Sequence, residues 1–115
     1  MIKKFEDIDA YKRARSLYPR VVSITQGFPS QGWHLRDQLC RSANSIPSNI
    51  AEGYGRSIPE FKLYLTRALG SCNETLSHLK NAIDVEWIDP TDGEKLLSEY
   101  TIVGKQIFRL RENWS

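Results

Sequence analysis

Cysteines, long apolar runs and a secretory signal are scarce or absent in this chain of 115 residues, and each lack excludes a class of protein. The two cysteines, Cys40 and Cys72, form no CxxC pair and cannot build a disulfide framework, so we expect buried reduced thiols. No apolar run approaches the roughly 20 residues that span a bilayer, so we expect no membrane partner. The basic N-terminal sequence has no apolar central region, which argues against secretion and for the cytoplasm.

Catalytic and metal-binding motifs are also missing. The two histidines, His34 and His78, show no HExxH spacing and stand beside no serine nucleophile motif. The acidic residues at positions 84–94 lack the ligand order and the glycine of a calcium loop, so helix capping explains them better. We therefore expect no catalytic residue, no metal site and no cofactor, in a protein that is not an enzyme.

The net charge is only +2, but the charges are unevenly distributed along the chain. Residues 1–70 carry 11 basic and 6 acidic side chains, whereas residues 71–115 carry 5 and 8. This distribution suits either attraction of a polyanion to one face or attraction between subunits. The candidates for nucleic-acid binding are Lys12, Arg13, Arg20, Arg36, Arg41, Arg56, Lys62 and Arg67. An ordinary solvated surface would explain the same residues.

Apolar residues recur at helical spacing in four segments, and no alternating strand pattern competes with them. The segments cover approximately residues 7–26, 31–54, 58–86 and 91–113. Helices of this length joined by short connections predict one all-α domain over residues 1–115. The simplest arrangement is an antiparallel up-down-up-down four-helix bundle.

Two capping patterns indicate where the third and fourth helices begin. Ser57 supplies a cap, Pro59 lies in the first turn and Glu60 follows the cap by three residues. Thr91 and Glu94 offer a second capping box for the fourth helix.

The second segment has one apolar and one polar face. Its apolar stripe comprises Leu35, Leu39, Ala43, Ile46 and Ile50. Its polar face comprises Gln38, Arg41, Ser45, Asn49 and Glu52. The polar face is either a satisfied seam between helices or subunits, or a binding surface. In a seam Arg41 would pair with Glu52 or Glu74, whereas on a surface it would contact phosphate.

Pro47 lies in the middle of the second segment, where it removes one backbone hydrogen bond. In an ordinary helix this would cost roughly 3 kcal/mol. Polar side chains close to a proline can rebond the freed backbone at a kink. We expect the hydroxyls of Ser45 and Ser48 and the amide of Asn49 to do so.

Glycines mark the end of the second segment and the middle of the third. Gly53 and Gly55 both suit the left-handed backbone of a helix terminus. Tyr54, between them, either stacks on an exposed base or packs its ring and leaves its hydroxyl in water. Gly70 costs about 0.5–1 kcal/mol relative to alanine, so we expect another backbone to approach it closely. Its expected partners are the small residues Ala43, Ser45 and Ala51.

These motifs resemble a family of small bacterial four-helix-bundle proteins. Some members are encoded in intervening sequences of the 23S ribosomal RNA gene, and others are accessory variability proteins of diversity-generating retroelements. The resemblance covers most of the chain. The residues that carry it most specifically are Ser45, Ile46, Pro47, Ser48, Asn49, Ile50, Ala51, Glu52, Gly53, Gly55 and Arg56.

The resemblance implies a non-enzymatic bundle that assembles as a ring-like homopentamer with a basic surface. The accessory proteins among these relatives bind nucleic acid and a reverse transcriptase. The implied partners are therefore a second copy of the chain, RNA or DNA, and a reverse transcriptase or another nucleic-acid-processing protein.

Two functions are consistent with the sequence. The first is an oligomeric bundle whose basic face binds structured RNA or DNA, or scaffolds a nucleic-acid-processing partner. The alternative is a structural or protein-interaction ring with no nucleic-acid role. Assembly is favoured in both cases, because several apolar residues fall outside the narrow core stripes. These residues are Leu17, Ile24, Leu96, Ile102 and Phe108.

Overall fold

The computed structural model describes all 115 residues and contains four α-helices and no β-strand, which confirms the all-α class. The helices are α1 (Asp9–Thr25), α2 (Trp33–Gly53), α3 (Ile58–Asp84) and α4 (Pro90–Asn113). Single 3₁₀ turns at Phe5–Asp7 and Ser30–Gly32 precede α1 and α2. The first three segments expected from the sequence each contain one of these helices, and α4 begins at Pro90, one residue before the fourth expected segment. None of the four has both the length and the apolar character that crossing a bilayer requires.

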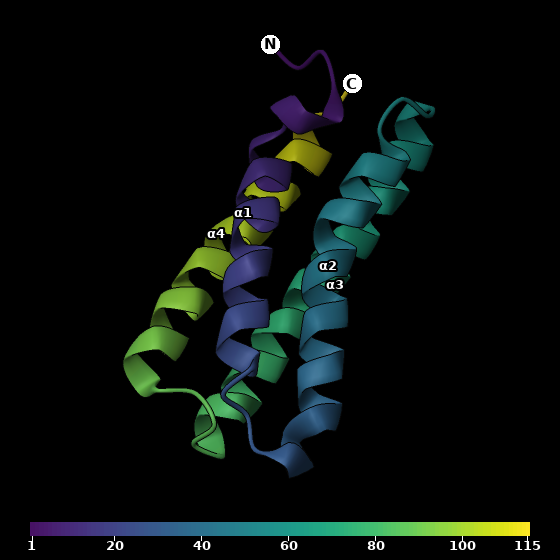
Figure 1. The fold of residues 1–115 in the computed structure, drawn as a ribbon. Helices are drawn as coiled ribbons and strands as arrows, with labels where there is room; N and C mark the ends of the chain where they lie inside the picture. Colours follow the sequence, from purple (N-terminus) through teal and green to yellow (C-terminus); the bar gives the residue numbers. More distant parts are fainter.

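The helices lie along one long axis in a body that measures 45 × 22 × 18 Å. Figure 1 shows the two chain ends at one end of this body and the α1–α2 connection at the other. Helices α1 and α3 each pack against both α2 and α4. The most extensive packing joins α2 to α3.

All four helices bury apolar side chains in one continuous core. The stripe expected on α2 is confirmed for Leu39, Ala43, Ile46 and Ile50, which are completely buried, whereas Leu35 is half-buried and packs against the core. Leu17 and Leu96 also belong to the core, with exposed fractions of 2%, so they do not contribute to an assembly face. The residues of that group that do remain exposed are Ile102, at 40%, and Phe108, at 48%.

The predicted cap of α3 is confirmed and the predicted cap of α4 is wrong. Ser57 Oγ accepts a hydrogen bond from the Glu60 amide at 3.3 Å, and a Glu60 carboxylate oxygen accepts one from Ser57 Oγ at 2.6 Å. These bonds hold the pKa of Glu60 below its ordinary value. Helix α4 is capped by Asp89, which accepts from the Thr91 amide at 3.1 Å. Because Pro90 occupies the first turn, the cap lies before it rather than at Thr91.

Helix α2 continues through Pro47, and neighbouring side chains bond to the backbone around it. Ser48 Oγ donates to the carbonyl of Asn44 at 2.9 Å, and Asn49 Nδ2 donates to the carbonyl of Ser45 at 2.8 Å. Neither side chain reaches the carbonyl of Ala43, which is the group that Pro47 leaves without its helical donor, so the rebonding expected from the sequence is not found. The Ser45 hydroxyl acts differently, because it accepts a hydrogen bond from Ser71 of α3 at 3.0 Å. It therefore joins two helices instead of rebonding the freed backbone.

Small residues bring α2 and α3 close together, but the glycine responsible is Gly53 and not Gly70. A Cβ atom at Gly53 would overlap the Cβ of Tyr64 and lie 2.9 Å from its Cγ. Gly70 is exposed, and nothing lies within 4 Å of the position of its missing Cβ, so the predicted close approach there is wrong. Ser45, which was expected to contact Gly70, instead contacts the next residue of α3, Ser71.

Alanine substitutions at the two glycines are predicted to change stability in opposite directions. Gly53→Ala forces Tyr64 away from α2, and such overpacking costs about 1–3 kcal/mol. Gly70→Ala meets open space and is expected to raise stability by about 0.5–1 kcal/mol. Urea unfolding followed by circular dichroism measures both changes. A stabilising Gly53→Ala would contradict the close contact with Tyr64.

Both cysteines are unpaired, and Cys72 is completely buried. Burial raises the pKa of the Cys72 thiol to about 11, whereas a thiol in an unfolded chain ionises near pH 8.5. Between these values the unfolded chain binds fewer protons than the native one, so this group makes stability fall as pH rises through that window. Comparing urea midpoints of the native sequence and Cys72→Ala from pH 7 to 10 tests this. An equally steep fall in both proteins would contradict it.

Candidate nucleic-acid interface

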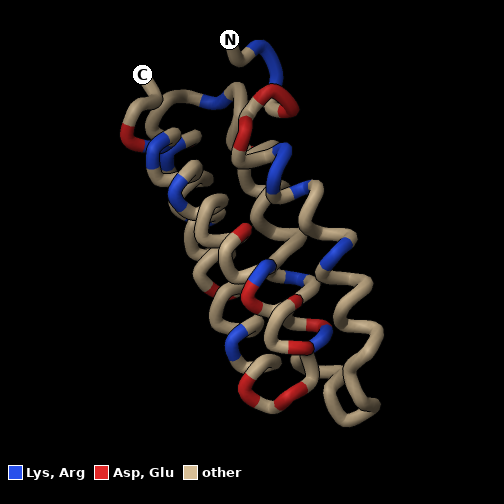
Figure 2. The backbone as a smooth tube through the Cα atoms, turned by 90° about the vertical axis from the view of Figure 1, so that its left-hand side faces the viewer, with Lys and Arg blue, Asp and Glu red and all other residues tan.

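The eight basic residues predicted to bind nucleic acid are distributed over three helices and one turn. Helix α1 carries Lys12, Arg13 and Arg20, α2 carries Arg36 and Arg41, the α2–α3 turn carries Arg56, and α3 carries Lys62 and Arg67. All are exposed except Arg13 and Lys62, which are half-buried. Figure 2 shows Lys and Arg positions along the length of the bundle with Asp and Glu positions among them. The charges therefore do not form one continuous basic patch.

Arg13 is held in an ion pair inside the protein. Its guanidinium donates to both carboxylate oxygens of Glu99, at 3.0 and 3.1 Å. Because Glu99 lies on α4, this pair joins α1 to α4. The carboxylate offsets the charge of Arg13, which reduces what this residue offers to an anionic ligand.

Arg56 and Arg67 are brought together on the ring of Tyr64. Each guanidinium carbon lies 4.9 Å from the ring centroid, which is the range of a cation–π interaction. Arg56 also donates from Nε to the carbonyl of Glu52 at 2.9 Å, and its nitrogen NH1 lies 3.8 Å from a carboxylate oxygen of Glu60. Arg67 makes no ion pair. We refer to Arg56, Tyr64 and Arg67 as the arginine–tyrosine cluster.

Of the two roles that the sequence allowed for Tyr54, the structure supports ring packing. Tyr54 packs edge-on against Phe61 and Trp114, with ring centroids 5.9 and 6.1 Å away, so its ring serves the packing of the bundle end. Tyr64 was missed. A signal for it was available, because Tyr64 and Arg67 are three residues apart and share one face of a helix.

The motif residues of α2 mostly face the protein interior or its neighbouring helix. Ile46 and Pro47 are buried, Ala51 is half-buried, and Ser45 and Asn49 bond to each other at 2.9 Å. Gly53 is helical and lies under Tyr64, so it is not the left-handed residue that the sequence allowed. Gly55 alone takes that conformation, with φ of 88°. The Glu52 side chain is exposed.

Arg41 lies outside the seam between α2 and α3. It is exposed and forms no ion pair with Glu52 or Glu74. Glu74 instead lies 3.2 Å from His78. The polar face of α2 is therefore divided. Ser45 and Asn49 complete the seam, and Arg41 is left on the surface.

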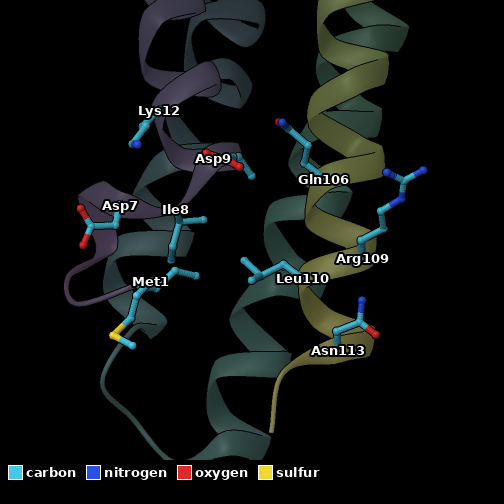
Figure 3. A pocket seen from close by; sticks show the side chains of 11 residues that line it. Met1, Asp7, Ile8, Asp9, Lys12, Gln106, Arg109, Leu110 and Asn113 are labelled. Carbon is cyan, nitrogen blue, oxygen red and sulfur yellow. The ribbon is translucent and has the colours of Figure 1, made fainter.

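No enclosed site with converging reactive groups accompanies these features. No group of three or more His, Cys, Asp and Glu side chains is placed to hold a metal ion. A hollow of about 680 Å³ lies between the N-terminal segment and the end of α4. Figure 3 shows Gln106 reaching towards α1, whereas Lys12 and Arg109 point to opposite sides. The charged side chains that line this hollow therefore do not converge on one point.

The fold and the exposed cations define an all-α helical bundle with a polar, partly basic surface. A family model for the 23S rRNA-intervening sequence protein matches residues 6–109. The chain therefore belongs to this family, which confirms the resemblance carried by the α2 motif.

One solved structure shows the same fold. It comes from Bacteroides thetaiotaomicron and is described as a protein with unknown function from the S23 ribosomal protein family. It superposes with a TM-score of 0.84 at 23% sequence identity, and the match covers 90% of this chain and 99% of that one. Among curated proteins, none matches this chain.

Proposed function

We propose that this protein is a non-enzymatic, cytoplasmic bundle that binds structured RNA or DNA through exposed basic side chains. The observation that carries the proposal is the lack of carboxylate partners for six of the eight candidate cations. These are Lys12, Arg20, Arg36, Arg41, Lys62 and Arg67. Cations without an internal partner are available for charge-assisted bonds to phosphate. Membership of a family named for an rRNA gene supports the same direction.

We further propose an up-down-up-down bundle that assembles as a homopentamer. Exposed apolar side chains of α3 and α4 support assembly, because Phe108 is 48% exposed beside a groove of about 300 Å³. Leu69 and Leu76 of α3 also line this groove. Five copies of a chain with net charge +2 give a particle of about +10, which strengthens sequence-independent attraction to nucleic acid.

A reverse transcriptase or another nucleic-acid-processing protein is the partner that such a scaffold would hold in place. The second candidate function is a protein-interaction ring with no nucleic-acid role. It is favoured by the same apolar groove and by the intermixing of acidic and basic positions along the bundle. Co-purification of one protein partner without nucleic acid would support this second function.

Binding is expected to be measurable by fluorescence anisotropy with a labelled RNA hairpin and a labelled DNA strand. Affinity should fall steeply between about 50 and 200 mM salt, because counterions are released from each neutralised phosphate. The double variant Arg36→Gln/Arg41→Gln removes two unpaired cations and should bind about fivefold more weakly. Arg13→Gln/Glu99→Gln is the matched control, because it removes both members of an ion pair and leaves the net charge unchanged. Absence of binding by the unmodified protein at low salt would remove the nucleic-acid function.

Assembly is predicted to depend on Phe108. Phe108→Glu places a charge in the exposed apolar groove and should lower the solution mass measured by light scattering from about five chains to fewer. Its circular dichroism should stay unchanged, because the side chain is not part of the core. Val85→Glu is the control, since Val85 is equally exposed, at 50%, near the end of α3. A variant that keeps the mass of the unmodified protein would contradict an interface at this groove.

A further inference from the structure

The arginine–tyrosine cluster is the one place where two of the candidate cations share a contact. Both guanidinium carbons lie 4.9 Å from the centroid of Tyr64, so they are within about 10 Å of one another. The two residues come from different elements, Arg56 from the α2–α3 turn and Arg67 from the third turn of α3. Tyr64 therefore acts as a common platform for charges that the sequence separates by 11 positions.

The backbone around the cluster is closely constrained. Gly53 permits Tyr64 to pack directly on the end of α2, where any larger residue would displace the ring. Gly55, with φ of 88°, provides the turn from which Arg56 returns to donate to the carbonyl of Glu52. The motif glycines thus position the platform and one of its two guanidinium groups before any ligand is bound.

The positive charges of the cluster are only partly offset by acidic neighbours. Two positive charges share one ring, and the single acidic neighbour, Glu60, lies 3.8 Å from Arg56. Glu60 is also engaged by Ser57 at the start of α3. Arg67 has no carboxylate and no hydrogen bond of its own to offset its charge. An anion that accepts hydrogen bonds from both guanidinium groups would relieve their mutual repulsion.

We propose that Arg56 and Arg67 together bind one phosphate of the nucleic-acid backbone, with Tyr64 as the platform that positions both. The proposal rests on the nucleic-acid function given above and names the site within it. A phosphate offers several oxygens to charge-assisted hydrogen bonds of about 2.7–2.9 Å, so one phosphate bridges the two guanidinium groups once both side chains turn towards it. Phosphate contacts carry no base sequence and do not depend on the sugar, so RNA and DNA are bound alike at this site.

A double-mutant cycle tests whether the two arginines act on one phosphate. Anisotropy is measured with a labelled oligothymidine strand and a labelled RNA hairpin for Arg56→Gln, Arg67→Gln and the double variant. Each single variant should bind both probes about five- to tenfold more weakly, and the double variant little more weakly than either single one. Arg36→Gln and Arg41→Gln form the control pair, because these arginines share no platform. The fold-losses of affinity of these two single variants should multiply in their double variant.

Substitutions at Tyr64 test whether its ring positions the two arginines, because they leave both positive charges in place. Tyr64→Leu removes the platform without removing a charge and should weaken binding as much as Arg67→Gln, whereas Tyr64→Phe retains the ring and should bind normally. Thermal unfolding of each variant checks the fold. Arg67→Gln is the safest of them, because Arg67 makes no hydrogen bond in the protein.

The outcomes distinguish the site from the function. Multiplying factors for Arg56 and Arg67, or an unaltered affinity of folded Tyr64→Leu, would overturn the shared phosphate site and leave nucleic-acid binding in place. Binding of only one of the two probes would also overturn it, because a phosphate contact does not choose between RNA and DNA. Failure of the unmodified protein to bind either probe would overturn both the site and the proposed function.

Discussion

The close contact of Gly53 with Tyr64 is the constraint on which the α2–α3 pair depends. Further along the same two helices, Ser71 donates to Ser45 at 3.0 Å and Thr75 donates to Ser42 at 2.9 Å. These are hydrogen bonds between short side chains, and they require the helices to lie close together. Gly53 allows the same spacing to continue to the end of α2. The motif residues of α2 are therefore best explained as the means by which one helix fits another.

The close approach of α2 and α3 also explains how the motif of α2 contributes to the proposed binding of nucleic acid. The seam itself is closed, because Ser45 and Asn49 satisfy one another and Ile46 lies in the core. The arginine–tyrosine cluster lies where the seam ends, at the α2–α3 turn and along the surface of α3. In the proposed function the motif contacts no ligand. It determines where Tyr64 sits, and thus where the arginines on either side of it are held.

The spacing of apolar residues predicted the core of α2, and the spacing of Ser57 and Glu60 predicted the cap of α3. Both patterns depend only on residues that are close in the sequence. The close approach predicted at Gly70 is wrong, since a helical pattern shows that a glycine lies in a helix but not which face meets another helix. The cap at Asp89 depended on Pro90 beginning α4 one residue early. Arg56 contacts Tyr64 after the left-handed turn at Gly55. This contact depends on the direction of the chain after the turn, which the spacing of residues in the sequence does not show.

Amide hydrogen exchange of the intact protein, with and without saturating single-stranded DNA, tests the central claim most directly. That claim is that the end of the α2–α3 seam receives the nucleic acid while the seam itself stays structural. The expected result is slower exchange on binding at residues 54–57, whose turn lies beside the arginine–tyrosine cluster, with no change at residues 42–50. Slower exchange confined to the α1–α2 or α3–α4 connection, with residues 54–57 unchanged, would contradict the account.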